Sequence, residues 1–389
     1  MNLQRFAKGT LFTILTLVTL PIIAYAAPVV TGITGTVTHG TTVTVSGSGF
    51  GQKSTAAPLV WDNCSGTNIT TLWSGGWPNN SSNATYNIAY TTPIRSVSLP
   101  HSHITKYLVG AHAESNGYNA GYNVMVWRTV TGVSYPTTYY MSSYQREDPS
   151  WNGSLGAPQD NNLKTFDFSN GGEPYAMNSS TNANWYANYG VPNNLSSPQW
   201  TINDDGGSLN NPDNNSHNFW WGSAVSPLNA WVKTEYEISI TNQNTGYIKM
   251  WDNGVLVVNY SGPTDKYTGT TKSFALGGYA RAQGASTQWR YFADLYFDNT
   301  PQRIVICAGS SWGSRGRCEV QIPQTWIDNG TSAQATVTIN QGSFADNSTA
   351  YLYVVDATGT PNTSGETITF GTGSSGVTPP AAPSGLSVN

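Results

Sequence analysis

The strongest constraint on the fold of this chain is a run of alternating apolar and polar side chains at residues 233–242. Tyr236, Ile238 and Ile240 fall on one side of an extended strand, because successive side chains of a strand point to opposite faces. The other side carries Glu235, Glu237 and Ser239. An amphipathic helix would instead repeat its apolar residues every three or four positions. The run therefore predicts a strand with one buried face.

A hairpin is predicted directly after this run. The alternating segments 247–251 and 255–260 flank Asn253 and Gly254. Asn-Gly between two such segments is a strong hairpin signal, since both turn residues need a positive φ. Short runs of this kind, bounded by Gly, Pro, Asn and Asp, recur along the chain, and no segment keeps the period of an amphipathic helix. We therefore expect an all-β protein.

Residues 1–26 have the features of a cleavable secretory signal peptide. Arg5 and Lys8 form a basic start, and an apolar run with a few interruptions follows at residues 11–23. The sequence Ala-Tyr-Ala ending at Ala26 supplies the small residues at a cleavage site. The alternative, a transmembrane anchor, needs about 20 apolar residues, more than this run provides. The sequence predicts a secreted or cell-surface protein that does not span the membrane after cleavage.

The charge of the mature chain excludes one class of partner. Of the 17 Lys and Arg, two lie in the signal peptide, which leaves 15 basic against 21 acidic residues and a net charge of −6. Nucleic-acid binding depends on clustered basic residues, so we expect no nucleic-acid partner. Charged residues are only 10% of the chain, but 14 Trp and 22 Tyr provide material for a large core.

The three cysteines divide into a pair and one remaining thiol. Cys307 and Cys318 are separated by a Gly- and Ser-rich turn, so they can face each other across a hairpin. In an oxidising compartment we expect them to form a disulfide. No histidine or basic residue is adjacent to Cys64 in the sequence, and we expect it to be a small buried apolar residue rather than a reactive thiol.

The two ends of the mature chain resemble parts of one domain family. The sequence PVVTGITGTVTHGTTVTVSGSGFG at residues 28–51 resembles the first strands of an IPT/TIG domain, which has an immunoglobulin-like fold. Sequences resembling the rest of that domain follow only at RIVICAGSSWGSRGRCEVQIPQTW, QATVTINQGSF, AYLYVVDATG and ETITFG, within residues 301–371. We expect one split domain, residues 27–56 and 301–371, because neither part alone has about seven strands. The alternative is two separate small sandwiches.

The segment between them, residues 57–300, resembles a second family. NAWVKTEYEISITNQNTGYIKMWDNGVLVVNYSG, LGGY and YFADLYFDN resemble the concanavalin-like jelly roll of bacterial laminin-G-like domains and of several polysaccharide lyase families. The predicted fold is therefore all-β, a concanavalin-like jelly-roll sandwich inserted into a split immunoglobulin-like (IPT/TIG) β-sandwich, after the signal peptide. Residues 372–389 form a Pro-, Gly- and Ser-rich tail. The resemblances indicate a bacterial protein.

A jelly roll implies a sheet face that binds sugar chains, with aromatic rings stacked on the sugars and polar groups bridging their hydroxyls. Strand alternation and the tryptophan-rich stretch 182–221 supply the candidates for glycan binding. They are Tyr140, Tyr144, Arg146, Lys164, Glu237, Lys249, Trp251, Trp220 and Trp221. In this interpretation Tyr140, Tyr144 and Arg146 share one strand face, and Lys164 shares another with Phe166 and Phe168.

Catalysis is a second interpretation, which the sequence leaves open. A lyase acting on uronates needs a group that neutralises the carboxylate and groups that exchange protons. Arg146 or Lys164 suits the first role, and Tyr144 or His217 the second. A glycoside hydrolase would use two carboxylates, such as Glu235 and Glu237, but here the residue between them is Tyr236, where related motifs carry Asp. If the protein is an enzyme, we expect a lyase rather than a hydrolase.

No cofactor is required by any of these functions, but a structural Ca²⁺ ion is a further expectation. Jelly-roll domains often bind calcium near their terminal strands, through carboxylate and carbonyl oxygens. Asp62, Asp294 and Asp298 lie at the two ends of the segment 57–300. His101 and His103 have a spacing that allows a zinc site only if a third ligand joins them.

Three functions remain on sequence grounds. The first is a secreted or surface protein whose jelly roll binds polysaccharide and whose immunoglobulin-like domain acts as spacer or attachment. The second is a polysaccharide lyase that acts by β-elimination, and the third is a structural adhesin or filament subunit. The expected partner is a polysaccharide or cell-surface glycan, and the oligomeric state is not predicted.

Overall fold

A computed structural model describes residues 26–77, 87–112, 124–148, 162–171, 183–190, 199–203, 209, 218–223, 228–265, 269–278 and 287–371. In these ranges the chain forms four antiparallel sheets and two short 3₁₀ helices, η1 (Ile69–Thr71) and η3 (Trp312–Ser314). The all-β prediction is confirmed. In the same ranges the structure has no helix with the length and apolar character needed to span a bilayer.

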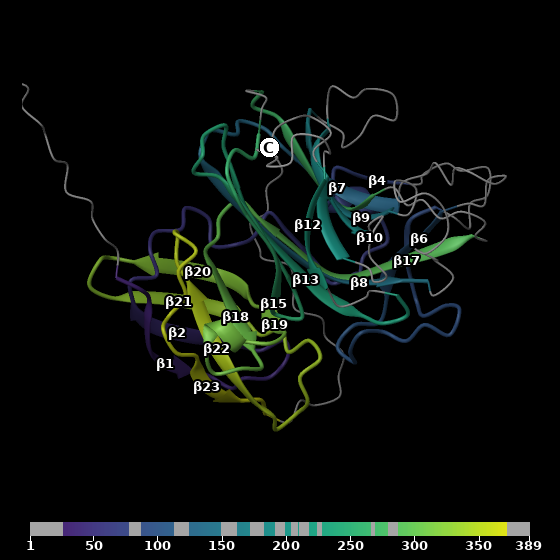
Figure 1. The fold of residues 1–389 in the computed structure, drawn as a ribbon. Coiled ribbons are helices and arrows are strands. Elements are labelled where there is room, and N and C mark those ends of the chain that lie inside the picture. Colours follow the sequence, from purple (N-terminus) through teal and green to yellow (C-terminus); the bar gives the residue numbers. More distant parts are fainter. Residues whose placement is uncertain are drawn as a thin grey trace, which may run out of the picture.

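Two large sheets form the bigger of two sandwiches, called here the large sandwich (Figure 1). The seven-stranded sheet has the order β12 (Asn218–Ser223), β11 (Gln199–Asn203), β10 (Ala183–Gly190), β9 (Asn162–Asn170), β16 (Lys272–Gly278), β7 (Val124–Val130), β4 (Gly75–Trp77). The eight-stranded sheet has the order β15 (Val255–Ser261), β14 (Tyr247–Asp252), β13 (Val232–Ile240), β8 (Thr137–Glu147), β17 (Gln288–Asp298), β6 (Tyr107–His112), β5 (Ala89–Thr91). Its eighth strand, β3 (Val60–Asp62), pairs with β17.

The inner faces of these two sheets enclose an aromatic core. Phe166, Phe168 and Trp185 of the seven-stranded sheet pack with Tyr236 and Phe297 of the eight-stranded sheet in one buried cluster. The ring centroids of Phe166 and Tyr236 lie 4.7 Å apart, so rings from both sheets stack directly. Burial of such large rings supplies much of the driving force for folding.

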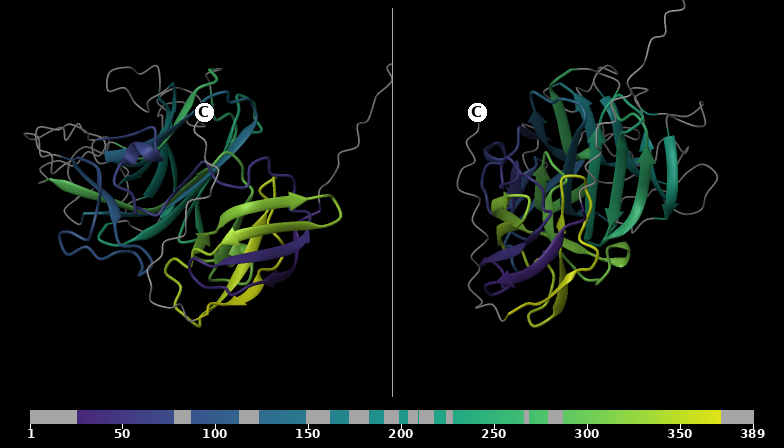
Figure 2. Two further views of the ribbon diagram at one scale, coloured as in Figure 1. Left: turned by 180° about the vertical axis from the view of Figure 1, so that it is seen from behind. Right: turned by 90° about the vertical axis from the view of Figure 1, so that its left-hand side faces the viewer.

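Two four-stranded sheets form the second body, called here the small sandwich, which lies beside the large one in every view (Figures 1 and 2). One sheet has the order β1 (Val29–Thr34), β2 (Thr42–Ser48), β21 (Ala333–Thr338), β20 (Ile322–Asp328). The other has the order β19 (Cys318–Val320), β18 (Arg303–Cys307), β22 (Thr349–Val355), β23 (Glu366–Thr369).

Strands from both ends of the chain meet in the small sandwich. β2 pairs antiparallel with β21, with Val43 opposite Val337 and Val45 opposite Ala335. These residues share a core cluster with Ile304 of the opposite sheet. Between β2 and β18 the chain builds the large sandwich, entering through β3 and leaving through β17, which pair with each other. Assignment of the small sandwich to the IPT/TIG family, and the exact domain limits, stay predictions.

The hairpin predicted from Asn-Gly is present. β13, β14 and β15 follow one another in the eight-stranded sheet, and Asn253 and Gly254 have φ values of 47° and 81°. The alternation predicted for 233–242 is also confirmed, because Tyr236 and Ile238 lie in the core whereas the glutamates point away from it.

Candidate functional site

The small sandwich covers part of the outer face of the eight-stranded sheet, and residues 94–104 pack on another part of it. Trp61, Tyr140 and Tyr296 of that sheet form one buried cluster with residues of the small sandwich. The latter are Val305, Cys307, Cys318, Val320, Ile322 and Tyr353. We call this contact the interdomain interface.

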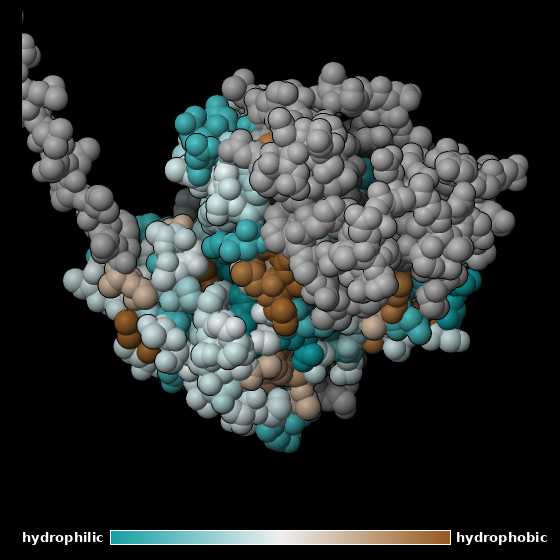
Figure 3. Space-filling view, in the orientation of Figure 1, coloured by the Kyte–Doolittle hydropathy of each residue, from teal (hydrophilic) through white to brown (hydrophobic). Residues whose placement is uncertain are grey.

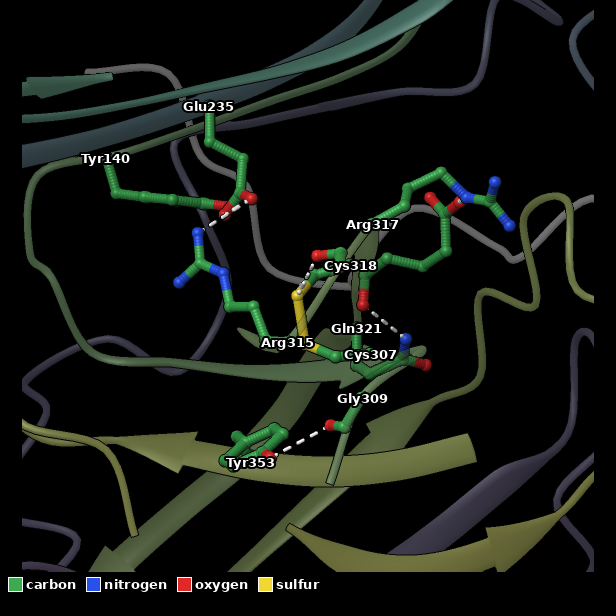
Figure 4. Close-up of a disulfide and its surroundings, with 11 residues drawn as sticks. Tyr140, Glu235, Cys307, Gly309, Arg315, Arg317, Cys318, Gln321 and Tyr353 are labelled. Carbon is green, nitrogen blue, oxygen red and sulfur yellow. Dashed lines mark hydrogen bonds and ion pairs between the residues drawn. A yellow bond between two sulfur atoms is a disulfide. The ribbon is translucent and has the colours of Figure 1, made fainter. Parts of the chain in front are cut away.

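Arg303 and Arg315 of the small sandwich form ion pairs with the large sandwich in this interface. Arg315 Nη2 lies 2.9 Å from Glu235 Oε1, and Tyr140 donates a hydrogen bond of 2.8 Å to the other oxygen of the same carboxylate (Figure 4). Arg303 Nη1 lies 2.8 Å from Glu237 Oε2. The two glutamates predicted to share a strand face do so, and each is neutralised by its own arginine.

These contacts correct the glycan-binding prediction for this face. Tyr140 and Tyr144 are buried, and Tyr144 donates a hydrogen bond to Glu319 of the small sandwich. The guanidinium of Arg315 lies over the ring of Trp251, 4.7 Å from its centroid. With Glu237 bound to Arg303, these side chains have protein partners where the prediction placed a sugar.

The two predicted cations of this sheet also have local partners. Lys249 is half-buried, and its Nζ lies 4.6 Å from the ring centroid of Tyr247. Both terminal nitrogens of Arg146 bond to Asn229, one to its backbone oxygen at 2.8 Å and one to its side-chain oxygen at 2.6 Å. Arg146 does not share the enclosed environment of Tyr140 and Tyr144.

A histidine cluster lies at one end of the interdomain interface. His39 comes from the small sandwich and stacks on His103 with ring centroids 4.3 Å apart. His101 Nε2 lies 2.8 Å from Asp294 Oδ2. Burial, and then the proximity of His103, lower the pKa of His39 to about 4, and burial also lowers the pKa of His103. The stacked rings of His39 and His103 are therefore neutral at neutral pH.

The carboxylates predicted to bind calcium are held by separate partners. Asp62 accepts hydrogen bonds from Trp73 and Tyr90, and Asp298 lies 2.7 Å from the ammonium of Lys53. In the described ranges no three His, Cys, Asp or Glu residues are arranged to hold a metal ion. Asp298 is paired with Lys53, and Asp294 is paired with His101. Because each carboxylate has its own partner, these positions do not fit a shared Ca²⁺ site.

The cysteine predictions are confirmed. Cys307 and Cys318 form a disulfide that joins β18 to β19 at the interdomain interface (Figure 4). Cys64 is a free and fully buried thiol, and burial raises its pKa. It is therefore not activated as a nucleophile.

Lys164 lies on a different face from the one predicted. Leu163 and Phe166 are both in the core, a spacing of three that an undistorted strand does not allow. The pairing of β9 with β10 shifts by one residue between Lys164 and Phe166. This β-bulge places Lys164 on the opposite side from Phe166 and Phe168, and so separates it from the core face.

The outer face of the seven-stranded sheet carries a second aromatic cluster, called here the tryptophan face. It contains Trp77, Met125, Trp127 and Ala275. The indole of Trp127 lies across Gly75 so closely that a Cβ atom on that glycine would come within 2.2 Å of the ring. A glycine is required at this position because the ring occupies the space of a side chain.

Polar groups continue the tryptophan face along the same cross-strand rows. Ala275 has Trp127 on one side and Asp167 on the other. Ser169 donates a hydrogen bond of 2.5 Å to Asp167, and Ser273 has Thr129 and Ser169 as its cross-strand neighbours. The sequence offered little signal for this face, because β7 reads Val-Met-Val-Trp and is apolar at successive positions.

Three predicted residues fall wholly or partly outside the described structure. His217 lies outside the described residues. Trp220 and Trp221 belong to β12, but only their backbone is described. Their predicted roles remain predictions.

No family model matches the chain, and no curated protein matches it. Among solved structures it is similar to an endo-β-1,4-glucuronan lyase from the fungus Trichoderma reesei, with 14% identity over 59% of this chain and 91% of that one and a TM-score of 0.37. It is also similar to the alginate lyase Aly36B (12% identity, 62% and 98%, TM-score 0.39) and to the carbohydrate recognition domain of Emp46p (8% identity, 60% and 98%, TM-score 0.33).

Proposed function

We propose that this protein is a secreted or cell-surface polysaccharide-binding protein that contacts its glycan with the tryptophan face. The observation that carries the proposal is the indole nitrogen of Trp77. Nε1 of this half-buried residue is a buried donor without a hydrogen-bond partner in the described ranges. A buried N–H group without an acceptor is costly, and a ligand oxygen would satisfy it.

The chemistry of the tryptophan face suits a sugar. The half-buried indole ring of Trp77 offers flat apolar surface to the C–H side of a pyranose ring, and the buried ring of Trp127 packs in the same cluster. Asp167 and the serine hydroxyls beside it are buried polar groups on the same face, and Ser169 donates a hydrogen bond to Asp167. A few polar groups among aromatic rings is the usual composition of a small-molecule site.

The small sandwich has a different role in this proposal. It packs on the part of the eight-stranded sheet that carries Trp61, Tyr140 and Tyr296, away from the tryptophan face of the seven-stranded sheet. We propose that it acts as a spacer or attachment domain, split as residues 27–56 and 301–371 around residues 57–300.

Catalysis by a lyase is not part of the proposal. Of its four predicted residues, Tyr144 is enclosed against Glu319, Arg146 binds Asn229, and Lys164 belongs to the other sheet. The structure therefore does not bring Tyr144, Arg146 and Lys164 together, and His217 lies outside the described residues.

The test is binding of the mature protein to a panel of acidic and neutral polysaccharides, compared with Trp77→Ala. We expect retention of at least one glycan by the wild type, at least about tenfold weaker affinity for the variant, and no unsaturated product in ultraviolet absorbance. Trp231→Ala is the matched control, because Trp231 is also partly buried but packs on the eight-stranded sheet beside Tyr107 and Tyr291. Absence of binding to every glycan, or equal loss in both variants, would refute the proposal.

A further inference from the structure

A lysine, an asparagine and an aspartate meet at one end of the seven-stranded sheet. Lys272 begins β16, Asn170 ends β9, and the two are direct cross-strand partners. Lys272 Nζ donates a hydrogen bond to Asn170 Oδ1. The same nitrogen lies 2.5 Å from Oδ2 of Asp265, in the segment between β15 and β16.

The surroundings of the amine are apolar and closed. The side chains of Lys272 and Asp265 are both fully buried. Lys272 Nζ lies 5.7 Å from the ring centroid of Tyr135 and 6.0 Å from that of Phe168. Tyr135 also donates a hydrogen bond of 2.5 Å to Asp265 Oδ2. Burial lowers the pKa of Lys272, which favours the neutral and nucleophilic amine.

We propose that Lys272 and Asn170 form an intramolecular isopeptide bond, with Asp265 as the proton-transfer group. The amine contacts the oxygen of the carboxamide whose carbon it attacks, so the reacting groups are already held in place. Asp265 bonds to the nitrogen that must lose protons as it is acylated. All three groups belong to this chain, so the reaction needs no other reactant.

Atoms and charges balance in this reaction. Asp265 accepts one proton from the Lys272 ammonium, which leaves a neutral amine and a neutral carboxylic acid. The amine lone pair attacks Cγ of Asn170, and the Cγ–Nδ2 bond breaks. The carboxyl group of Asp265 gives its proton to the leaving nitrogen and takes a second proton from Nζ of Lys272. One ammonia molecule leaves, and Nζ remains as a secondary amide. No oxidation or reduction occurs.

The bond would cross-link two neighbouring strands that are far apart in sequence. Residues 170 and 272 are 102 positions apart. Closing so long a loop covalently restricts the unfolded chain, as a disulfide does, and does so without a redox-sensitive bond. The large sandwich would then keep β9 and β16 joined even in a reducing environment.

Intact mass and peptide mapping of the wild-type protein test the proposal directly. We expect a mass lower than that of the disulfide-bonded chain by one ammonia, about 17 Da. Trypsin should release a branched peptide that joins residues 165–233 to residues 267–281, with no cleavage after Lys272. A wild-type mass equal to that of the disulfide-bonded chain would overturn the proposal, whatever the variants do.

Single substitutions test the role of each of the three residues in forming the cross-link. Lys272→Arg and Asn170→Ala should each lack the branched peptide, and Asp265→Asn should lack it while both reacting groups are present. Lys53→Arg is the matched control, because Lys53 is an equally buried lysine paired with an aspartate, and it should retain the cross-link.

The branched peptide also separates the cross-link from a succinimide, which loses the same mass without branching. Asn-Gly pairs that could form one are Asn170-Gly171 itself and those that begin at Asn116, Asn152, Asn253 and Asn329. Loss of ammonia without the branched peptide, or a cross-link that persists in Lys272→Arg, would refute the proposal. None of these results depends on glycan binding.

Discussion

The guanidinium of Arg303 and the carboxylate of Glu237 meet at 2.8 Å, although the two residues belong to different sandwiches. Both side chains are almost completely buried, and the Arg303 guanidinium also lies 3.9 Å from the ring centroid of Tyr140. Glu237 pairs with Arg303 at the surface where the two sandwiches join. The ion pair therefore couples the stability of the large sandwich to the presence of the small one.

Removal of one partner of this pair should be more harmful than removal of both. Arg303→Met leaves Glu237 buried without its cation, and we expect a loss of about 3–5 kcal/mol in the free energy of unfolding. The double variant Arg303→Met with Glu237→Gln should recover part of that loss, because no charge is then left uncompensated. Urea unfolding at neutral pH measures both values.

An exposed pair provides the control for this prediction. Arg95 lies 3.4 Å from Asp148, and its side chain is 49% exposed. Arg95→Met should cost less than about 1 kcal/mol, because solvent screens exposed pairs. Equal costs at Arg95 and Arg303 would contradict the assignment of Arg303 to a buried interdomain pair.

The sequence predicted those structural features that depend on residues close together in the chain. Strand alternation identified β13, β14 and β15, and Asn-Gly identified the turn between the last two. The pairing of Cys307 with Cys318 followed from a short hairpin. In each case the signal lies within a few residues, where periodicity and turn chemistry act directly.

The sequence could not show which strand face meets which partner. In the sequence, Glu237 and Tyr140 resemble exposed residues of strands whose side chains alternate between two faces. In the structure, Arg303 and the small sandwich enclose them. At Lys164, one bulge changed the face of the side chain, and no residue type marks that bulge. Packing between residues far apart in sequence decided the first outcome, and an irregular strand pairing the second.

The hairpin tip at Gly254 should be sensitive to a single methyl group. Its φ is 81°, and a Cβ atom there would come within 1.7 Å of the backbone oxygen of Gly316 in the small sandwich. We expect Gly254→Ala to cost about 2–4 kcal/mol in unfolding free energy, from left-handed strain and from separation of the two loops. Gly132 also has a positive φ but open space around it, so Gly132→Ala should cost only about 1 kcal/mol. Similar losses at both glycines would mean that the contact with Gly316 does not matter.

The histidine cluster should make the interdomain interface sensitive to acid. The pKa of His39 is about 4 in the folded protein and 6.5 in its ordinary state. Between these values the unfolded chain binds more protons, so the stability contributed by neutral His39 is present at neutral pH and is lost as the pH falls below about 6.5. His103 and His101 oppose a charge on His39, whereas Asp294 favours it.

His39→Asn tests this pH dependence. Asparagine keeps a side-chain acceptor for the backbone N–H of Gln341 but does not titrate. Relative to this variant, the wild type should lose about 2 kcal/mol of unfolding free energy between neutral pH and about pH 4, measured by urea unfolding at each pH. The comparison cancels the titration of groups that do not interact with His39. Parallel pH profiles for the two proteins would show that His39 does not couple to folding.

Loss of the disulfide should weaken the small sandwich. Cys307 and Cys318 close a loop with a sequence separation of 11. Replacing both by alanine should cost about 3 kcal/mol, mainly because the unfolded chain regains freedom. Thermal unfolding of the wild type with and without a thiol reductant should reproduce the same direction, and the reductant should have no effect on the double variant. A response of the double variant to reductant would point to Cys64 instead.

The position of the Trp127 ring gives a test of the tryptophan face that does not remove an aromatic side chain. In Gly75→Ala the new methyl group would occupy space within 2.2 Å of Trp127 Cζ2, so the indole must shift. We expect a loss of about 1–3 kcal/mol in stability, typical of overpacking, together with at least about tenfold weaker binding to any glycan that the wild type retains. Gly32→Ala is the control, because no atom lies within 4 Å of a Cβ at Gly32 in β1. A folded Gly75→Ala protein with a shifted tryptophan emission but unchanged affinity would exclude Trp127 from the binding surface and leave Trp77 as the residue to test.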